Sequence, residues 1–263
     1  ERAPVPMTRL AATGHGCLLL AGGHAQLLIL SGGAARAGTS GHSADTDTLA
    51  SAIVYELASS ASAIAFQGSR VLVATGEQVR LFDEKGKALS AVKVDQGVSA
   101  VGLIDEGRLL VAGYDAGDLE LLPVSPGTAR PAFSLEETIP APVERIVEGP
   151  RQTLVVGYTS GDLGIWSLET GKRLRHFKLH GPVVHLFVDR ETRRLYAATE
   201  VGDYRAIDLA AFYQDYCELM ADVWSNVPVV WQAGVPAMAP PSARHRCAAK
   251  PAANVAVVDE AQQ

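Results

Sequence analysis

Five short apolar runs recur along the chain, and each of them ends in small residues. A polar turn and a second apolar segment of strand length follow every run. The runs lie at 18–23, 71–76, 109–114, 153–158 and 194–199, and the second segments at 27–31, 79–83, 119–124, 163–167 and 204–208. Apolar segments of this length, bounded by turn residues, are typical of β-strands. The pattern therefore predicts similar β-hairpins in series.

The spacing of the hairpins indicates a repeat architecture. Equivalent apolar positions in the second segments are 52, 40, 44 and 41 residues apart, and they are Leu30, Phe82, Leu122, Trp166 and Ile207. A period of about 40 to 45 residues is that of a four-stranded β-propeller blade. The one long spacing contains residues 32–48, a Gly-, Ser- and Thr-rich stretch with little to bury, which we expect to form a flexible inserted loop.

Further strand-like segments flank the hairpins and complete the expected blades. They lie at 61–66, 98–103, 143–147 and 183–188 before the hairpins, and at 88–94, 129–135 and 173–179 after them. The fold class we expect is all-β: a β-propeller of four-stranded blades, with five repeats visible within residues 1–209. Small residues would recur where neighbouring blades converge. A sandwich or barrel is the alternative, but neither requires small residues at a fixed spacing.

One unit carries a recognisable family pattern. Residues 160–188 resemble a WD repeat, and the matching positions are a turn at 160–162, an Ile–Trp pair at 165–166, a hairpin at 169–171 and a reversed Gly–His pair at 180–181. Ser167 stands where that family has the aspartate of its name-giving dipeptide. The resemblance covers roughly residues 7–209 and is weak outside this unit. It implies a propeller of the WD-repeat (WD40-like) type, which more often closes with about seven blades.

The strand pattern stops after Asp208. Residues 209–224 have apolar side chains at spacings of three and four, which predicts an amphipathic helix. We expect residues 210–238 to form this helix and a hairpin packed on the propeller, and residues 239–263 to form an extended or disordered tail.

The helix has two interpretations. It either caps an end of the propeller or docks a partner, because the fifth unit has no evident fourth strand and the helix stands in its place. In the second case the candidate partner-binding residues are Phe212, Tyr216, Leu219, Met220, Trp224 and Trp231.

Composition narrows the class of partner. The net charge of −6 repels phosphate backbones, so no nucleic acid is expected as partner. The basic residues within 172–178 are expected to be a solvated strand edge. No run of eighteen apolar residues is present, so no membrane partner is expected. Three cysteines predict reduced thiols and a cytoplasmic location, with Cys217 buried or inert; Cys217 and Cys247 could pair only in an oxidising compartment.

Candidate chemistry is sparse. The common phosphate-binding, nucleophile and zinc motifs are absent, so we expect no enzyme and no cofactor or metal. Asp118, Asp162 and Asp203 occupy equivalent turns, where a carboxylate can accept backbone N–H bonds; the alternative is a ring of carboxylates that holds a cation. Trp166 is expected in the structural core, between blades.

The function expected from these observations is a non-catalytic protein–protein interaction scaffold. The segment after the repeats resembles those of large bacterial multidomain proteins, which implies a bacterial signalling or defence assembly. A ligand-sensing or enzymatic propeller that uses the central channel is one alternative, although a small-molecule ligand is not favoured; a purely architectural spacer is another. Two missing blades are expected to come from a partner protein or from an upstream part of the same polypeptide. The alternative is a closed five-bladed ring in which residues 227–238 supply the last strand.

Overall fold

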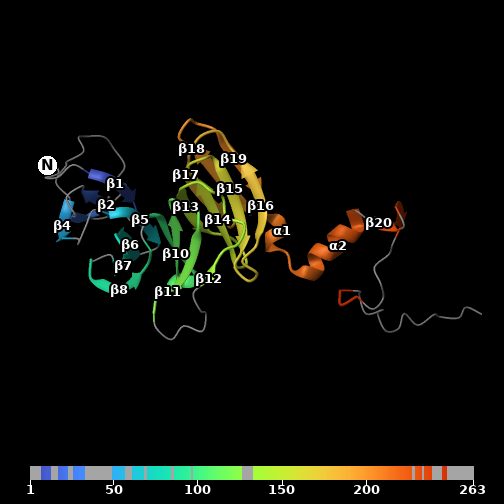
Figure 1. Cartoon of the computed structure of the whole chain (residues 1–263), viewed down its shortest axis with the longest axis horizontal. Coiled ribbons are helices and arrows are strands. Elements are labelled where there is room, and N and C mark those ends of the chain that lie inside the picture. The colour runs from blue at the N-terminus through green and yellow to red at the C-terminus, as the bar shows by residue number, and fades with distance from the viewer. Residues whose placement is uncertain are drawn as a thin grey trace, which may run out of the picture. The chain divides into compact units, whose positions relative to one another are not determined.

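The computed structural model describes most of the chain and divides it into two compact units, Glu1–Ile207 and Asp208–Gln263. Figure 1 shows the strands of the first unit and the helices of the second. The described residues are 7–12, 17–22, 26–32, 49–56, 61–67, 70–83, 86–95, 97–125, 133–226, 229–232, 234–238 and 245–247. Of the loop predicted at residues 32–48, Gly32 ends a strand, while residues 33–48 and most of the predicted tail lie outside these ranges.

Antiparallel sheets build the first unit, as the repeat predicts. Within the described residues there are four sheets of four strands and one of three, and each follows chain order. The strands are β1 (Met7–Ala12), β2 (Cys17–Gly22), β3 (Gln26–Gly32) and β4 (Leu49–Glu56); β5 (Ala61–Gln67), β6 (Arg70–Thr75), β7 (Gln78–Asp83) and β8 (Ala88–Lys93); β9 (Val98–Ile104), β10 (Leu109–Tyr114), β11 (Leu119–Pro123) and β12 (Phe133–Ser134); β13 (Val143–Glu148), β14 (Thr153–Tyr158), β15 (Asp162–Ser167) and β16 (Arg173–Lys178); β17 (Val183–Asp189), β18 (Arg194–Thr199) and β19 (Tyr204–Asp208). A single 3-10 turn, η1 (Asp105–Gly107), joins β9 to β10.

The first strands of successive sheets pack side by side, in the order β1, β5, β9, β13 and β17. The small residues of the second strands make this approach possible. A Cβ on Gly113 would lie 2.6 Å from Cγ1 of Val143, and one on Gly157 would lie 2.5 Å from Cγ1 of Val183. Such distances are too short for real side chains, so each glycine makes room for a valine of the next sheet. Among the described strands, no comparable packing joins β17 to β1.

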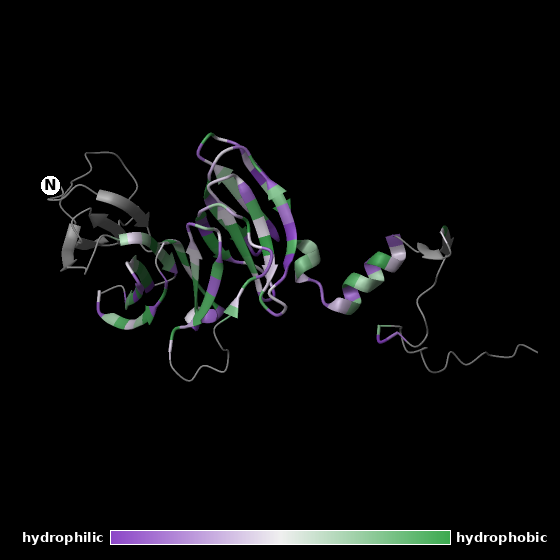
Figure 2. Ribbon diagram, in the orientation of Figure 1, coloured by the Kyte–Doolittle hydropathy of each residue, from purple (hydrophilic) through white to green (hydrophobic). Residues whose placement is uncertain are grey.

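The core lies between successive sheets. One buried cluster joins the second and third sheets and includes Leu72, Val79, Val101 and Leu110. Another joins the third and fourth sheets and includes Leu119, Val143, Leu154 and Trp166. Figure 2 shows hydrophobic residues along the inner strands and more hydrophilic ones along β16. Each blade therefore buries its apolar face against its neighbour, as in other repeat proteins.

A β-bulge recurs at one place in all five sheets. The first strand has one extra residue opposite the end of the second strand, at Thr8, Ser62, Ser99, Glu144 and Val184. A bulge of this kind bends and twists the strand that carries it. The repeat is therefore one of backbone geometry as well as of residue type.

The second unit contains two short helices and a hairpin. They are α1 (Ala210–Tyr213), α2 (Tyr216–Asn226), β20 (Val229–Gln232) and β21 (Val235–Met238), and the two strands pair.

The prediction of one helix over residues 209–224 is wrong. Gln214 is extended, with φ −73° and ψ 147°. Asp215 starts a new helix, because its Oδ1 accepts the N–H groups of Cys217 and Glu218, each at 2.8 Å, and Glu218 Oε2 accepts the N–H of Asp215 at 2.8 Å. This is a capping box, which fixes a helix N-terminus at that point.

Candidate functional site

The most distinctive surface of the first unit is one face of the fifth sheet. Phe187 pairs with Tyr196, and His185 pairs with Ala198, so these side chains share a face of β17 and β18. In β19, Tyr204 and Ala206 stand one repeat after Leu163 and Ile165 of β15. We call the set the outer face of the fifth sheet, and it consists of His185, Phe187, Tyr196, Ala198, Tyr204 and Ala206.

The equivalent positions in the preceding sheets are covered. In the fourth sheet Val155 and Leu163 are fully buried, and in the third sheet Val111 and Leu121 are fully buried. Gly157 shows what covers them, because the first strand of the following sheet lies against it. These positions are therefore the contact between one blade and the next.

The outer face of the fifth sheet is open to solvent. Tyr204 is 75% exposed and Phe187 is 52% exposed. The ring centroids of Phe187 and Tyr196 lie 6.4 Å apart with an interplanar angle of 24°, so the two side chains form an aromatic platform. The opposite face is buried, as Leu195 and Ala197 show. Within the described residues β17 packs on β13 and β14, and no fourth strand pairs with β19.

The sequence contains a signal for this face, which is a change of residue type at equivalent positions of the repeat. The position of Phe187 is Ala65, Gly102 and Val147 in the preceding sheets, and the position of Tyr204 is Val79, Leu119 and Leu163. Large aromatic residues replace small or aliphatic ones only in the last of the visible repeats. Aligning the units residue by residue identifies the substitution.

Asp162 links two strands of the fourth sheet. Its Oδ1 lies 2.8 Å from Nε2 of His176, and its Oδ2 accepts hydrogen bonds from Lys178 Nζ at 2.8 Å and from Ser160 Oγ at 2.6 Å. Burial raises the pKa of the Asp162 carboxyl, but the hydrogen bonds from Lys178, Ser160 and His176 outweigh it and hold the pKa at about 2. The carboxylate therefore joins the start of β15 to β16.

The other two predicted turn aspartates have different partners. Asp203 Oδ2 accepts the backbone N–H of His180 at 3.0 Å, and this bond lowers the pKa of Asp203. Asp118 Oδ1 accepts a hydrogen bond from the Thr138 hydroxyl at 3.4 Å. The three positions are equivalent in the repeat, but their contacts are not. In the described part of the chain, no group of three or more His, Cys, Asp or Glu side chains is arranged to hold a metal ion.

A hollow on the third sheet is lined by carboxylates, including Asp95, Asp115, Asp118 and Glu120. The hydroxyl of Tyr114 donates a hydrogen bond to Glu120 Oε2 at 2.6 Å. Burial raises the pKa of Tyr114, and this hydrogen bond raises it further. The hollow therefore combines four carboxylates with apolar residues such as Leu119 and Leu135.

Trp166 lies fully buried in the core cluster between the third and fourth sheets. Its indole N–H donates a hydrogen bond to the backbone carbonyl of Glu136 at 2.9 Å. The centroids of the Trp166 and Tyr158 rings lie 6.2 Å apart. Because Glu136 follows β12, one side chain connects two blades by packing and by a hydrogen bond.

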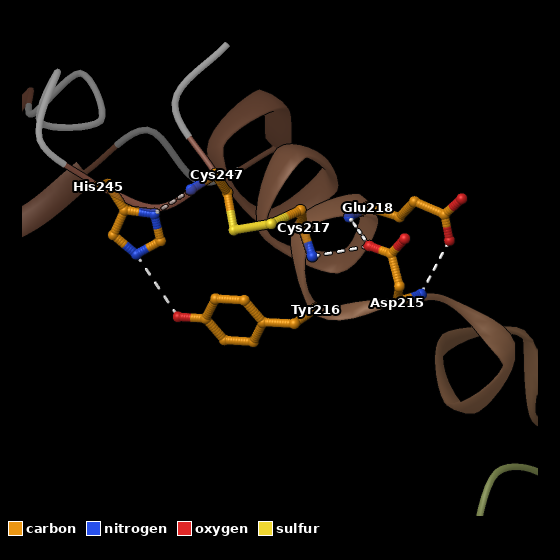
Figure 3. Close-up of a disulfide and its surroundings, with 6 residues drawn as sticks. All are labelled: Asp215, Tyr216, Cys217, Glu218, His245 and Cys247. Atoms are coloured by element: carbon orange, nitrogen blue, oxygen red, sulfur yellow. Dashed lines mark hydrogen bonds between the residues drawn. A yellow bond between two sulfur atoms is a disulfide. The ribbon is translucent and has the colours of Figure 1, made fainter. Parts of the chain in front are cut away.

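A disulfide joins Cys217 to Cys247 in the second unit (Figure 3). The two Cα atoms are 5.0 Å apart, and 30 residues separate them in sequence. The prediction of reduced thiols is therefore wrong for this pair, and Cys217 lies on an exposed part of α2 and is not buried. Spacing alone did not predict the pairing, because it depends on residues 245–247 lying against α2.

Aromatic and cationic side chains surround the disulfide. The ring of His245 stacks on Tyr216 at 6.0 Å and meets the edge of Trp224 at 5.0 Å, while the guanidinium carbon of Arg246 lies 3.8 Å from the centre of the Tyr216 ring. This arrangement forms a small cluster on α2 that depends on the returning segment.

The predicted partner-binding residues differ in exposure. Tyr216 is 46% exposed, and Leu219 is also exposed. Phe212, Met220 and Trp224 are half-buried, and the side chain of Trp231 lies outside the described residues.

In the described part of the chain no helix is long and apolar enough to cross a membrane.

No protein-family model matches the sequence. No curated protein matches it either. Among solved structures, it is similar to the β-propeller domain of Cps50 (Swd1) from Myceliophteria thermophila, with a TM-score of 0.56 and 16% identity over 76% of this chain and 64% of that one. It is also similar to the computationally designed Ika8 protein, with a TM-score of 0.55 and 15% identity over 77% of this chain and 58% of that one. The chain thus spans less than two thirds of either structure, and its fold is a β-propeller.

Proposed function

We propose that the chain is a non-catalytic protein-interaction scaffold and that its binding surface is the outer face of the fifth sheet. One observation carries the proposal. Tyr204 is 75% exposed, whereas Leu163, at the same position of the preceding blade, is fully buried. The face that the next blade covers in the fourth sheet is therefore exposed in the fifth sheet.

The chemistry of this face favours a protein as the partner. Tyr and Phe are enriched in the buried cores of protein–protein interfaces, and they supply much of the binding energy there. Phe187, Tyr196 and Tyr204 present three such rings on neighbouring strands. A contiguous exposed apolar patch usually marks an interaction site.

Helix α2 is a second candidate for partner binding. Tyr216, Leu219 and Val223 are exposed on it, and the disulfide holds Arg246 against the ring of Tyr216. Tyr216 and Leu219 belong to the set that the sequence pattern predicts for docking. A protein with an apolar groove and an acidic rim fits this surface.

We place the scaffold within a larger assembly, and the resemblance of the tail favours a bacterial signalling or defence system. Ligand sensing through the central channel and a purely architectural role remain the competing functions. The cytoplasmic location stays a prediction, and the disulfide favours an oxidising compartment instead, since disulfides are rare in the cytosol.

The experiment that tests the proposal is a quantitative pull-down from the native host. The tagged wild-type chain is compared with Phe187→Ser/Tyr204→Ser, and Leu89→Ser is the matched control because Leu89 is 48% exposed on β8 of the second sheet. Thermal melts verify that each variant folds. We expect one or more proteins to co-purify with wild type and Leu89→Ser, and to be lost from the double variant. Retention by the double variant contradicts the proposed surface, and no specific capture by the wild type contradicts the scaffold.

A further inference from the structure

We infer that the outer face of the fifth sheet receives a further propeller blade from a separate polypeptide, whose innermost strand has a small residue opposite Phe187. This inference rests on the proposed function and names the kind of partner. It follows from the way in which neighbouring blades of this chain pack against one another.

Each blade contact uses the same parts. The first strand of the incoming sheet lies against the first and second strands of the sheet before it, as Val143 lies against Gly113 and Val183 against Gly157. Ala198 stands at the position of these two glycines in the fifth sheet, and Ala74 stands there in the second sheet, where it is fully buried. The small residue that admits an incoming strand is therefore present on the open face.

A second contact position selects which strand fits. In the third sheet a Cβ on Gly102 would lie 2.9 Å from Cγ2 of Ile146, so a large residue of the incoming strand fits only because the receiving residue is glycine. In the fifth sheet this receiving position is Phe187, stacked on Tyr196. Phe187 is larger than the receiving residues Ala65, Gly102 and Val147 of the preceding sheets, so we expect the incoming strand to have Gly or Ala where β13 has Ile146.

The first strands of this chain do not meet that requirement. The residues at the position of Ile146 are Leu10, Ile64, Val101 and Leu186, all of them large and apolar. Neither β1 of the same chain nor β1 of a second copy thus offers the small residue. Head-to-tail joining of two copies would also bring together ten sheets, beyond the four to eight blades of typical propellers.

The course of the chain favours a separate polypeptide. Each of the four preceding sheets continues into a fourth strand and then into the next sheet, whereas β19 leads directly into α1 and α2. The chain is matched over 64% of the length of the similar propeller domain of Cps50 (Swd1). One to three added blades would bring five sheets to a typical ring.

Site-specific photo-crosslinking in the native host tests the inference. A benzophenone amino acid is placed at position 187 or 204 of the full chain, with position 89 as the matched exposed control. The crosslinked peptides are then sequenced. We expect positions 187 and 204 to crosslink to one separate polypeptide, in a strand segment with Gly or Ala near the crosslink, followed by an apolar run that ends in small residues. Position 89 should not capture it.

Other outcomes overturn the inference. A crosslink to residues 7–12, within the chain or from a second copy, indicates closure or self-assembly. A crosslink to a helical segment, or to an upstream part of the same polypeptide, excludes a blade supplied in trans. If the pull-down shows a partner that depends on Phe187 and Tyr204 but the crosslinked segment is not a blade strand, only this inference fails and the scaffold function stands.

A second variant separates shape from apolar character. Phe187→Val/Tyr196→Val gives the fifth sheet the residues that the fourth sheet has at Val147 and Val155, and it keeps the face apolar. We expect capture of the blade-bearing partner to fall about tenfold, because the aromatic contacts to a small residue are lost. Unchanged capture shows that Phe187 and Tyr196 do not select the incoming strand and contradicts the inference.

Discussion

The role of some residues can be predicted from their type, whereas the role of others depends on their neighbours in the folded chain. Burial of Trp166 was predictable, because a tryptophan at a repeated apolar position is usually part of the core. Its hydrogen bond to the Glu136 carbonyl was not, since residues 30 positions apart meet only through the packing of two blades. The contacts of Asp162 likewise depend on the register between β15 and β16.

Substitution of Trp166 tests its place between two blades. We expect Trp166→Ala to lower the free energy of unfolding by about 3 to 5 kcal/mol, because a large cavity opens in the core. Trp166→Phe should lose less, about 1 to 3 kcal/mol, since it keeps most of the apolar contact but leaves the Glu136 carbonyl without its donor. Urea melts measure both values. A loss below about 1 kcal/mol for the alanine variant would contradict the position described here.

The carboxylate of Asp162 predicts a pH dependence of stability. Its pKa of about 2 lies below the usual 3.8, so ionised Asp162 stabilises the folded state above about pH 4, and this contribution is lost as the pH falls towards 2. His176 and Lys178 are more than 40% exposed, so we expect only about 1 kcal/mol. Urea melts of wild type and Asp162→Asn between pH 5 and pH 2 should therefore converge at the acidic end. A constant difference would show that ionisation of Asp162 does not matter.

At the level of elements, strands were more predictable than their irregularities. Short continuous apolar runs located the inner strands to within one or two residues, because burial on both faces constrains residue type. The recurring bulge left no consistent signal in residue type, since Thr8, Ser62 and Ser99 carry a hydroxyl group but Glu144 and Val184 do not. The break between α1 and α2 did leave one, because the spacing of Asp215 and Glu218 is that of a capping box.

The disulfide should control the order of the second unit. A loop closed by cysteines 30 residues apart is expected to gain about 3 to 4 kcal/mol from the lowered entropy of the unfolded chain. Peptide mapping without reduction should recover Cys217 and Cys247 in one linked product. In Cys217→Ser/Cys247→Ser, the amides of α2 should exchange faster with deuterium, while those of β13 to β15 should not change. Free thiols at both positions in protein purified without reductant would contradict the pairing.

At the scale of the molecule, the repeat period predicted the propeller. It did not predict the open face, because that face is exposed only where no further sheet packs on the fifth one among the described residues. An exposed Tyr204 and a buried Leu163 both fit a period-two strand pattern, so the pattern cannot distinguish a covered face from an open one. The helix set of Phe212, Tyr216, Leu219, Met220, Trp224 and Trp231 drew attention for its amphipathic spacing, whereas the aromatic face on β17 to β19 is distinguished only by comparison with its equivalents.

Hydrogen exchange of the free chain distinguishes an open arc from a closed ring. In the fourth sheet β15 lies between β14 and β16, and the next sheet covers its face; β19 pairs with β18 alone among the described strands. We therefore expect amides of β19 and the outer part of β18 to exchange faster than those of β14 and β15, because local opening of an uncovered edge strand breaks fewer contacts. A partner blade that binds the outer face of the fifth sheet should slow this exchange selectively. If β19 is already protected as well as β15 in the free monomer, another segment of this chain covers it, and the binding surface must lie elsewhere.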